Sequence, residues 1–102
     1  MKKEIADKWI AALRSGEYKQ GIGELHDTGN NSYCCLGVLC KVMDSPIKEG
    51  QSFLSLEAQK QANMRTGHGD FHSPDNLVML NDSGLASFDD IADIIETEWE
   101  NL

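Results

Sequence analysis

The sequence lacks a long apolar run, an apolar leader segment and an even set of cysteines. These absences argue against a membrane-spanning, a secreted and a disulfide-stabilised protein, respectively. No stretch of its 102 residues approaches the roughly 20 consecutive apolar residues of a membrane-spanning helix. The first residues, MKKEIADKW, are charged and lack an apolar segment, so we expect no secretory signal. Three cysteines, two of them adjacent, make a poor disulfide framework. We therefore expect reduced thiols and a cytoplasmic protein.

Basic residues are nearly missing from the last third of the chain. Residues 1–64 carry eight Lys or Arg and eight Asp or Glu, which cancel. Residues 65–102 carry Arg65 against nine acids, so the net charge of −8 resides there. Such a surface repels phosphate backbones and attracts basic partners. We expect no direct nucleic-acid binding, and a partner protein with a basic surface.

The composition, 40% apolar and 25% charged, is typical of one compact globular domain over residues 1–102. Ile5, Trp9 and Leu13 recur at helical spacing, which predicts a first helix that ends at Ser15-Gly16. Glycines, asparagines and turn residues follow over 17–33, where Ile22 is among the few apolar side chains. There we predict a small β-hairpin in which 19–26 pairs with 31–35.

The segment SYCCLGVLCKVMD, residues 32–44, contains all three cysteines beside a run of aliphatic residues. Its apolar positions cover nearly the whole circumference of a helix, which predicts a buried helix at the centre of the domain. Gly37 weakens such a helix by about 1 kcal/mol relative to alanine. A close neighbour packed against Gly37 would explain its presence.

Three further helices are predicted from capping signals. Ser55 caps a short helix with Leu56 and Met64 as anchors, and Ser73-Pro74 begins another. Ser87, with Asp90 three residues later, begins the last helix, whose inner stripe is formed by Phe88, Ile91, Ile95, Trp99 and Leu102. The segment RTGHGDFHS, residues 65–73, which joins the first two of these helices, is predicted to be a polar loop. The fold class is thus α+β and mainly α: four to five short helices around the Cys-containing helix, with one small hairpin.

The cysteines lack the spacing of a reactive or metal-binding set. C-C-x4-C differs from the C-x2-C of zinc and redox sites, so we predict that the thiols are core packing. His68 and His72, with Asp70, are a weaker candidate metal site, and a solvated loop is the favoured interpretation. His26 beside Cys34 or Cys35 is a weak candidate for a base and nucleophile. No metal, cofactor or catalytic residue is predicted.

Two surfaces remain as candidate sites. The outer face of the last helix is acidic, and we predict that it contacts a partner; a merely solvated face is the alternative. Its residues are Asp89, Asp93, Glu96 and Glu100. The second candidate is a small-ligand site at a turn, formed by Ser15, Tyr18, Lys19, Gln20, Asn81 and Asp82. The G-x-G of residues 21–23 lacks the context of a dinucleotide-binding loop. The segment LVMLNDSGLASFDDIADII looks like part of a helix-turn-helix, but its second helix is acidic, which favours a plain αα-corner.

Three motifs, taken together, resemble a recurrent group of small uncharacterised phage and prophage proteins. They are W-x2-ALRSG-x-Y-x-Q over residues 9–20, YCCLGVLC over 33–40 and LND-x-G-x2-SF-x2-IAD-x-IE over 80–96. The resemblance implies a virus-encoded accessory protein in the cytoplasm of a bacterial host. It supplies no catalytic residues.

Three functions from different classes follow. The favoured one is a non-enzymatic binding module that contacts a host macromolecule through the acidic last helix, to blunt a defence or to redirect a host enzyme. The second is a protein that binds or sequesters a nucleotide-like small ligand. A Cys-dependent hydrolase ranks last. The sequence leaves the oligomeric state open.

Overall fold

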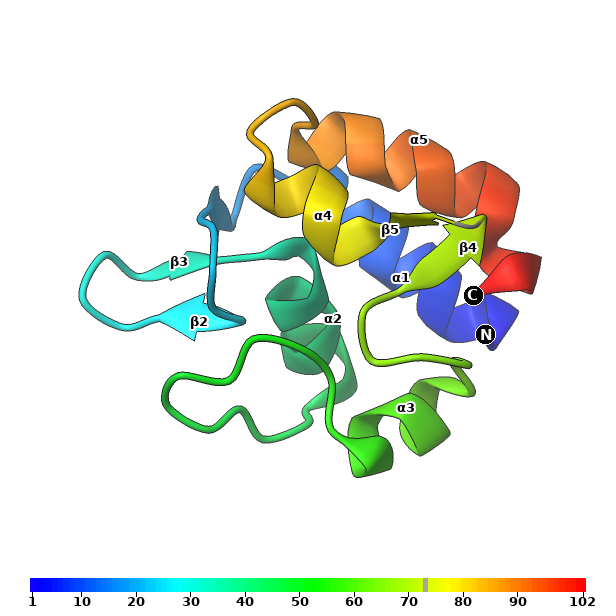
Figure 1. Ribbon diagram of the computed structural model, residues 1–102, viewed down its shortest axis with the longest axis horizontal. Coiled ribbons are helices and arrows are strands. Elements are labelled where there is room, and N and C mark those ends of the chain that lie inside the picture. Colours follow the sequence, from blue (N-terminus) through cyan, green and yellow to red (C-terminus); the bar gives the residue numbers. More distant parts are fainter. Residues whose placement is uncertain (73) are drawn as a thin grey trace.

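The computed structural model describes residues 1–72 and 74–102, which pack on one hydrophobic core (Figure 1). The fold is α+β and mainly helical, as predicted. In chain order the elements are α1 (Lys3–Arg14), β1 (Lys19–Gln20), β2 (His26–Asp27), β3 (Ser32–Tyr33), α2 (Cys35–Met43), α3 (Leu56–Ala62), β4 (Asp70–His72), β5 (Asp75–Asn76), α4 (Leu77–Asp82), α5 (Phe88–Glu98) and the 3-10 helix η1 (Trp99–Asn101).

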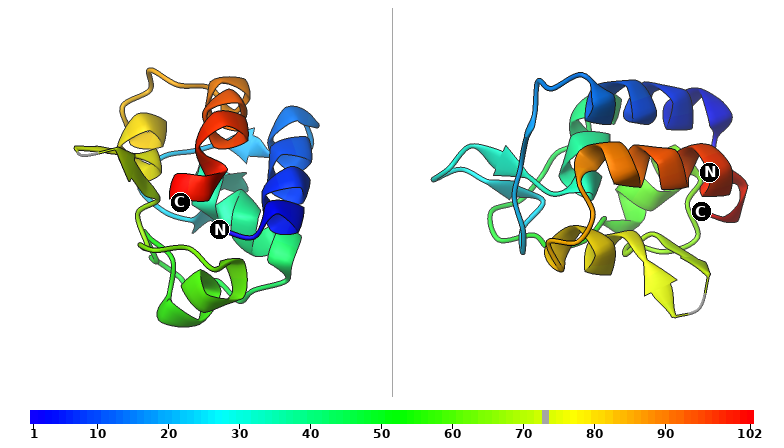
Figure 2. Two further views of the ribbon diagram at one scale, coloured as in Figure 1. Left: turned by 90° about the vertical axis from the view of Figure 1, so that its right-hand side faces the viewer. Right: turned by 90° about the horizontal axis from the view of Figure 1, so that it is seen from above.

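Helices α1 and α5 lie side by side and run in opposite directions (Figures 1 and 2). Each turns its apolar stripe inward: Trp9 and Leu13 are buried on α1, and Ile91 and Ile95 on α5. These are the stripes that the helical spacing predicts. α5 also begins as predicted, because Ser87 and Asp90 form a reciprocal capping box. The first and last segments of the chain therefore build one layer of the core.

Helix α2 lies against this pair, and its residues 35–40 are all buried, which confirms the predicted central helix. Trp9 donates a hydrogen bond from Nε1 to the Cys35 carbonyl at 2.8 Å, so α1 and α2 are joined by a polar contact inside the core. Gly37 has the close neighbour that its presence predicts. A Cβ built there would lie 1.8 Å from the backbone oxygen of Leu25, so only glycine fits.

The predicted hairpin is correct near its turn, at residues 26–33, and wrong for residues 19–25. β2 pairs antiparallel with β3, whereas β1 pairs parallel with β3 on the other side. Residues 21–25 do not continue as a strand, because they turn to bury Leu25, whose N–H donates to the Gln51 carbonyl at 2.7 Å. Ile22, in that turn, is 63% exposed and contributes nothing to the core. The sheet thus has three short strands in the order β1-β3-β2.

Two helix predictions need correction. Ser55 caps α3 and Met64 is buried, both as predicted, but Leu56 is 69% exposed and is no anchor. Leu54, just before the helix, is buried in its place. α4 begins at Leu77, not at Ser73-Pro74. Asn76 is its cap, because the Asn76 side chain accepts a hydrogen bond from the Met79 N–H at 2.8 Å. Ser73 itself lies outside the described residues.

The glycine-containing segment before α4 is not only a loop. Its residues Asp70–His72 form β4, which pairs antiparallel with β5 as a second small hairpin. Buried Gly67 and Gly69 precede it, and a Cβ at either position would press on Leu54 or Leu77. These glycines allow close packing rather than loop freedom, which the sequence alone does not distinguish.

The two ends of the chain lie next to each other (Figure 2). The ammonium group of Met1 donates to the Trp99 carbonyl at 3.0 Å, and the Arg65 N–H donates to the Leu102 carbonyl at 2.7 Å. Leu102 is buried in the core. Among the described residues, no helix has both the length and the apolar character needed to cross a membrane.

Candidate functional site

The acidic face of α5 and η1 is exposed to solvent along its length. Asp89, Asp93, Glu96 and Glu100 all lie on this outer surface, as the helical spacing predicts. We call these four residues the acidic face. No basic residue occurs in α5 itself, so any neutralising cation comes from elsewhere in the chain.

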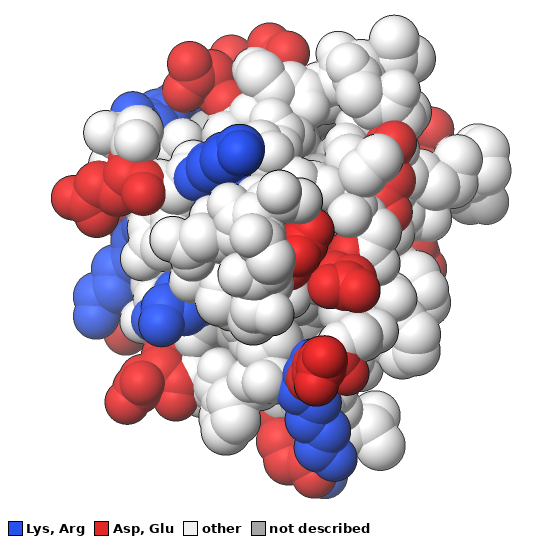
Figure 3. All heavy atoms as spheres, turned by 90° about the vertical axis from the view of Figure 1, so that its left-hand side faces the viewer, with Lys and Arg blue, Asp and Glu red and all other residues white. Residues whose placement is uncertain are grey.

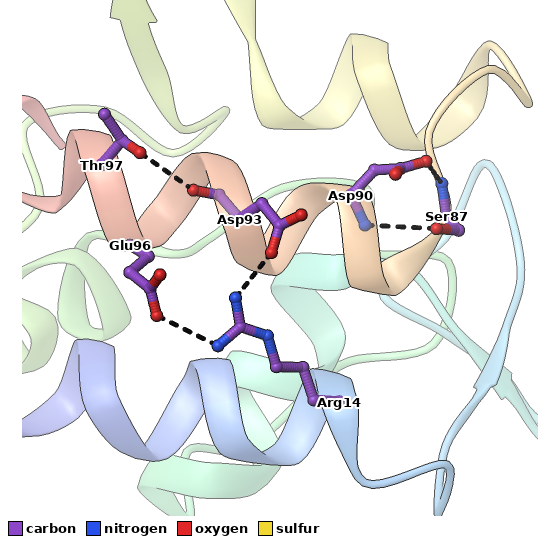
Figure 4. A network of polar contacts seen from close by, with 6 residues as sticks. All are labelled: Arg14, Ser87, Asp90, Asp93, Glu96 and Thr97. Carbon is purple, nitrogen blue, oxygen red and sulfur yellow. Dashed lines mark hydrogen bonds and ion pairs between the residues drawn. The ribbon is translucent and has the colours of Figure 1, made fainter.

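One cation does reach the acidic face from α1. Arg14 donates to Asp93 Oδ1 at 2.6 Å and to Glu96 Oε2 at 3.1 Å, with its guanidinium between the two helices (Figure 4). The Asp93 and Glu96 hydrogen bonds raise the pKa of Arg14. Asp93 and Glu96 keep side-chain exposures of 71% and 63%, so both remain open to solvent while paired. Arg14 thus partly neutralises the middle of the face, and the Met1 ammonium group, which donates to the Trp99 carbonyl at 3.0 Å and interacts with Glu100, lies near its η1 end.

A neighbouring acid is held by a different network. Glu98 accepts a hydrogen bond from the Asn101 side chain at 2.8 Å and lies 2.9 Å from His72 Nε2. The Asn101 hydrogen bond, followed by the contact with His72, lowers the pKa of Glu98. This pair ties β4 to the end of α5. Glu98 is therefore part of the fold's internal contacts, although the sequence places it among the surface acids.

The second predicted site is assembled in part. Gln20 Nε2 donates to Asn81 Oδ1 at 2.9 Å and to the Ala86 carbonyl at 3.0 Å. Asn81 Nδ2 donates to the Gly21 carbonyl at 2.8 Å and to Asp82 Oδ1 at 3.1 Å. Gln20, Asn81 and Asp82 therefore meet, as predicted, but they bind one another and the backbone.

Asn81 also caps the central helix. Its Oδ1 accepts the N–H of Cys35, the first residue of α2, at 3.1 Å, and Asn81 is 1% exposed. The residue before α2, Cys34, provides no side-chain cap of its own. A buried amide from α4 thus satisfies an N–H that the helix leaves unpaired. Asn81 therefore joins β1, α2 and α4 through hydrogen bonds. Ligand binding by Gln20, Asn81 and Asp82 stays a prediction.

The other members of that predicted set lie apart from the network. Ser15 turns back on its own helix, since its hydroxyl donates to the Ala12 carbonyl at 2.6 Å. Tyr18 packs edge-on against Tyr33, with ring centroids 5.3 Å apart. Lys19 is exposed on β1. The structure therefore separates these three side chains from the Asn81 network.

The thiols are buried and have the properties of core groups. Cys34, Cys35 and Cys40 are each at most 3% exposed, and none forms a disulfide. Burial raises the pKa of Cys34 and of Cys40 to about 11, and raises the pKa of Cys35 well above its ordinary value. Thiolate is the reactive form of cysteine. At neutral pH these side chains are protonated, which is unfavourable for nucleophilic chemistry.

The histidines are engaged with separate partners. His68 stacks on Phe53, with ring centroids 4.7 Å apart, and His72 pairs with Glu98. His26 stacks flat on Tyr33 at 4.1 Å. In the part of the chain that the structure describes, no three His, Cys, Asp or Glu side chains gather as metal ligands. The weaker candidate metal site at His68, His72 and Asp70 therefore has no supporting geometry among the described residues.

A hollow of about 480 Å³ lies beside β4 and β5. Its walls combine two side chains that carry or can carry positive charge, Arg65 and His72, with the carboxylates of Asp70 and Asp75. Mixed charge of this kind favours no ligand of one sign.

Sequence reasoning missed three exposed apolar side chains near the Asn81 network: Ile22, Met79 and Leu85, with exposures of 63%, 56% and 86%. Leu85 had a signal, because it is a large aliphatic residue in the otherwise small and polar turn NDSGLAS. Met79 and Ile22 had none, since apolar residues in a predicted helix and a predicted strand are ordinarily assigned to the core.

Comparison with known proteins places the chain in a family without assigning an activity. No curated protein and no solved structure matches it significantly. The family described as Domain of unknown function (DUF8296) matches residues 1–69, which include α1, the three-stranded sheet, α2 and α3. That match spans more than half of the 102 residues, and the protein belongs to the DUF8296 family.

Proposed function

We propose that this protein is a non-enzymatic binding module that contacts a basic protein surface through the acidic face of α5 and η1. The observation that carries the proposal is the charge arrangement. The four carboxylates Asp89, Asp93, Glu96 and Glu100 are exposed on one face, and one internal cation, Arg14, contacts two of them. A surface of one sign attracts partners of the opposite sign and speeds their association.

The biological setting is part of the same proposal and rests on the sequence resemblance to phage proteins. In that setting the module is an accessory protein in a bacterial cytoplasm. Its partner is a host protein with a basic surface, which it blocks or redirects, for example to blunt a defence. The buried, protonated thiols support a non-enzymatic role because they are unfavourable nucleophiles.

The test compares two variants with the same net charge. The first neutralises the acidic face by Asp89→Asn, Asp93→Asn, Glu96→Gln and Glu100→Gln. The control neutralises four exposed acids on other elements by Glu4→Gln, Asp7→Asn, Glu49→Gln and Glu57→Gln. Each variant is immobilised and used to capture proteins from a bacterial lysate at about 0.1 M and about 1 M salt, where the screening length falls from about 10 Å to about 3 Å.

The proposal predicts a discrete protein that wild type and the control variant retain at low salt and release at high salt. The face variant should lose it while its melting temperature stays close to that of wild type. Equal retention by both variants and wild type would rule out the acidic face as the contact surface. Loss by both variants would show that net charge alone, and not this face, governs retention.

A further inference from the structure

Three exposed large apolar residues, Ile22, Met79 and Leu85, belong to segments that meet near the end of α4. Ile22 lies between Gly21, whose carbonyl accepts from Asn81 Nδ2 at 2.8 Å, and Gly23, whose N–H donates to Asp82 Oδ1 at 3.2 Å. The turn that carries Ile22 is therefore fastened to the last residues of α4. Leu85 lies three residues after the last residue of α4 and precedes Ala86.

The loop after α4 is fastened to the same place. The Ala86 carbonyl accepts from Gln20 Nε2 at 3.0 Å, which joins the α4–α5 connection to β1. Met79 lies three residues before Asp82 in α4, and residues with this spacing share a helix face. Ile22, Met79 and Leu85 thus extend from three segments that hydrogen bonds hold together. We call these three residues the apolar cluster.

Clustering is what makes these exposed residues informative. Single apolar side chains on a surface are ordinary, whereas several at one place mark an interaction site. The other large apolar residues that are exposed in the described chain, Phe53 and Leu56, lie on or beside α3, at the opposite end of the molecule from the α4–α5 loop (Figure 1). The buried Asn81 network fixes the segments that carry the cluster. A partner would therefore meet a preformed surface, and would lose less entropy on binding.

The surroundings of the cluster specify the partner's charge. Asp82 lies within it, and Asp89 and Asp90 follow Leu85 at the start of α5, while β1 contributes one base, Lys19. Figure 3 shows this side of the molecule, where acidic side chains and several basic ones are set among broad areas that are neither acidic nor basic. An acidic margin around an apolar centre repels nucleic acid, and it complements a protein segment that carries apolar residues flanked by lysine or arginine.

We infer that the apolar cluster is the specificity-determining part of the binding surface, and that it docks a basic amphipathic segment of another protein. In this arrangement one or two apolar side chains of the partner pack on Ile22 and Leu85. Its flanking bases meet Asp82 and the start of the acidic face. This inference rests on the proposed function, because it assigns the apolar contact to the same basic partner.

Two peptide probes separate the inference from the proposed function. One is an amphipathic helix of leucines and lysines; the other has the same length and number of lysines with serine in place of leucine. Their affinities for the full chain are measured by fluorescence anisotropy, and amide chemical shifts of the 102-residue protein map the contact. The cluster variant is Ile22→Ser with Leu85→Ser. Leu56→Ser is the control, because Leu56 is equally exposed but lies on α3.

The expected result is that the leucine–lysine peptide binds wild type and the control about tenfold more tightly than the serine–lysine peptide does. In the cluster variant this tenfold advantage should vanish, and shifts in wild type should centre on residues 21–24 and 79–86. Equal affinities of the two peptides for wild type, or an advantage that survives in the cluster variant, would overturn the inference. In either case, binding of both peptides through the acidic face would leave the proposed function standing. If neither peptide binds at low salt, both fail.

Discussion

Replacing Gly37 by alanine tests the packing of α2, because helix propensity and the structure predict changes of opposite sign in the free energy of unfolding. In an isolated helix, alanine is more favourable than glycine by about 1 kcal/mol, so sequence propensity alone predicts stabilisation. The structure predicts the reverse. A Cβ at this position would lie 1.8 Å from the Leu25 carbonyl oxygen and 2.6 Å from its carbon, and these are backbone atoms that no rotamer change can move.

The size of the loss follows from what holds Leu25 in place. Its N–H donates to the Gln51 carbonyl at 2.7 Å, and its own carbonyl accepts from the Cys34 N–H at 3.2 Å. Overpacking of a rigid site costs about 1–3 kcal/mol. Displacing Leu25 also weakens two backbone hydrogen bonds, at about 1 kcal/mol each. After about 1 kcal/mol of helix propensity is recovered, the net loss is about 3 kcal/mol. In a domain of this length, that lowers the melting temperature by about 15 °C.

Urea unfolding, followed by the fluorescence of Trp9 and Trp99, measures this difference directly. The calibrating variant is Ala11→Gly on the exposed side of α1, where only propensity changes and the loss should be about 1 kcal/mol. The midpoint for Gly37→Ala should fall with little change in the denaturant slope. A Gly37→Ala protein that is as stable as wild type, or more stable, would refute the close approach of α2 to Leu25.

Three further predictions concern the core. Asn81→Ala should lower the free energy of unfolding by about 3 kcal/mol in urea, because buried N–H and C=O groups lose their partners; a loss below about 1 kcal/mol would contradict the capping role. Iodoacetamide at pH 8 should leave the thiols of the native protein unmodified, because burial raises the pKa of Cys34 and Cys40 to about 11 and thiolate is scarce. In urea the same thiols should be labelled rapidly. Fast labelling of the native protein, followed by mass spectrometry, would contradict their burial. A chain of residues 1–69, the family-matched segment, should show no cooperative thermal transition by circular dichroism, because it lacks α5, the helix that packs along α1. A cooperative transition would show that the segment folds alone.

The sequence predicts those elements that depend on helical spacing or on capping residues within one segment. The stripes of α1 and α5 and the capping box of Ser87 depend on spacing along one helix, and the structure has them as predicted. Gly37 was informative because an unfavourable residue in a helix implies a neighbour. The position of α4 was missed because Asn76 and Ser73 are both good caps, and only the pairing of β5 with β4 decides between them.

Long-range contacts account for what the sequence did not show. Arg14 and Asp93 are 79 residues apart, so reading α5 by itself gave a face with no cation. Gln20 and Asn81 were grouped correctly, yet their mutual hydrogen bonds depend on how β1, α2 and α4 converge. Leu56 was assigned to the core because it is large and apolar, whereas the small Ala58 and Ala62 are the residues that α3 buries. Which apolar residues remain exposed depends on tertiary packing, so the sequence alone does not predict the apolar cluster.

The most direct measurement of the proposed binding role is the affinity of Arg14→Gln for the leucine–lysine peptide. This change frees the carboxylates of Asp93 and Glu96 and removes one positive charge, while the loss of exposed ion pairs has little effect on stability. If the acidic face contacts a basic partner, Arg14→Gln should bind more tightly than wild type at low salt, and the gain should disappear at high salt. A gain caused by exposed core residues would persist at high salt, so the loss of the gain at high salt separates an electrostatic contact from damage to the fold. Unchanged or weaker binding at low salt would contradict a contact through the acidic face.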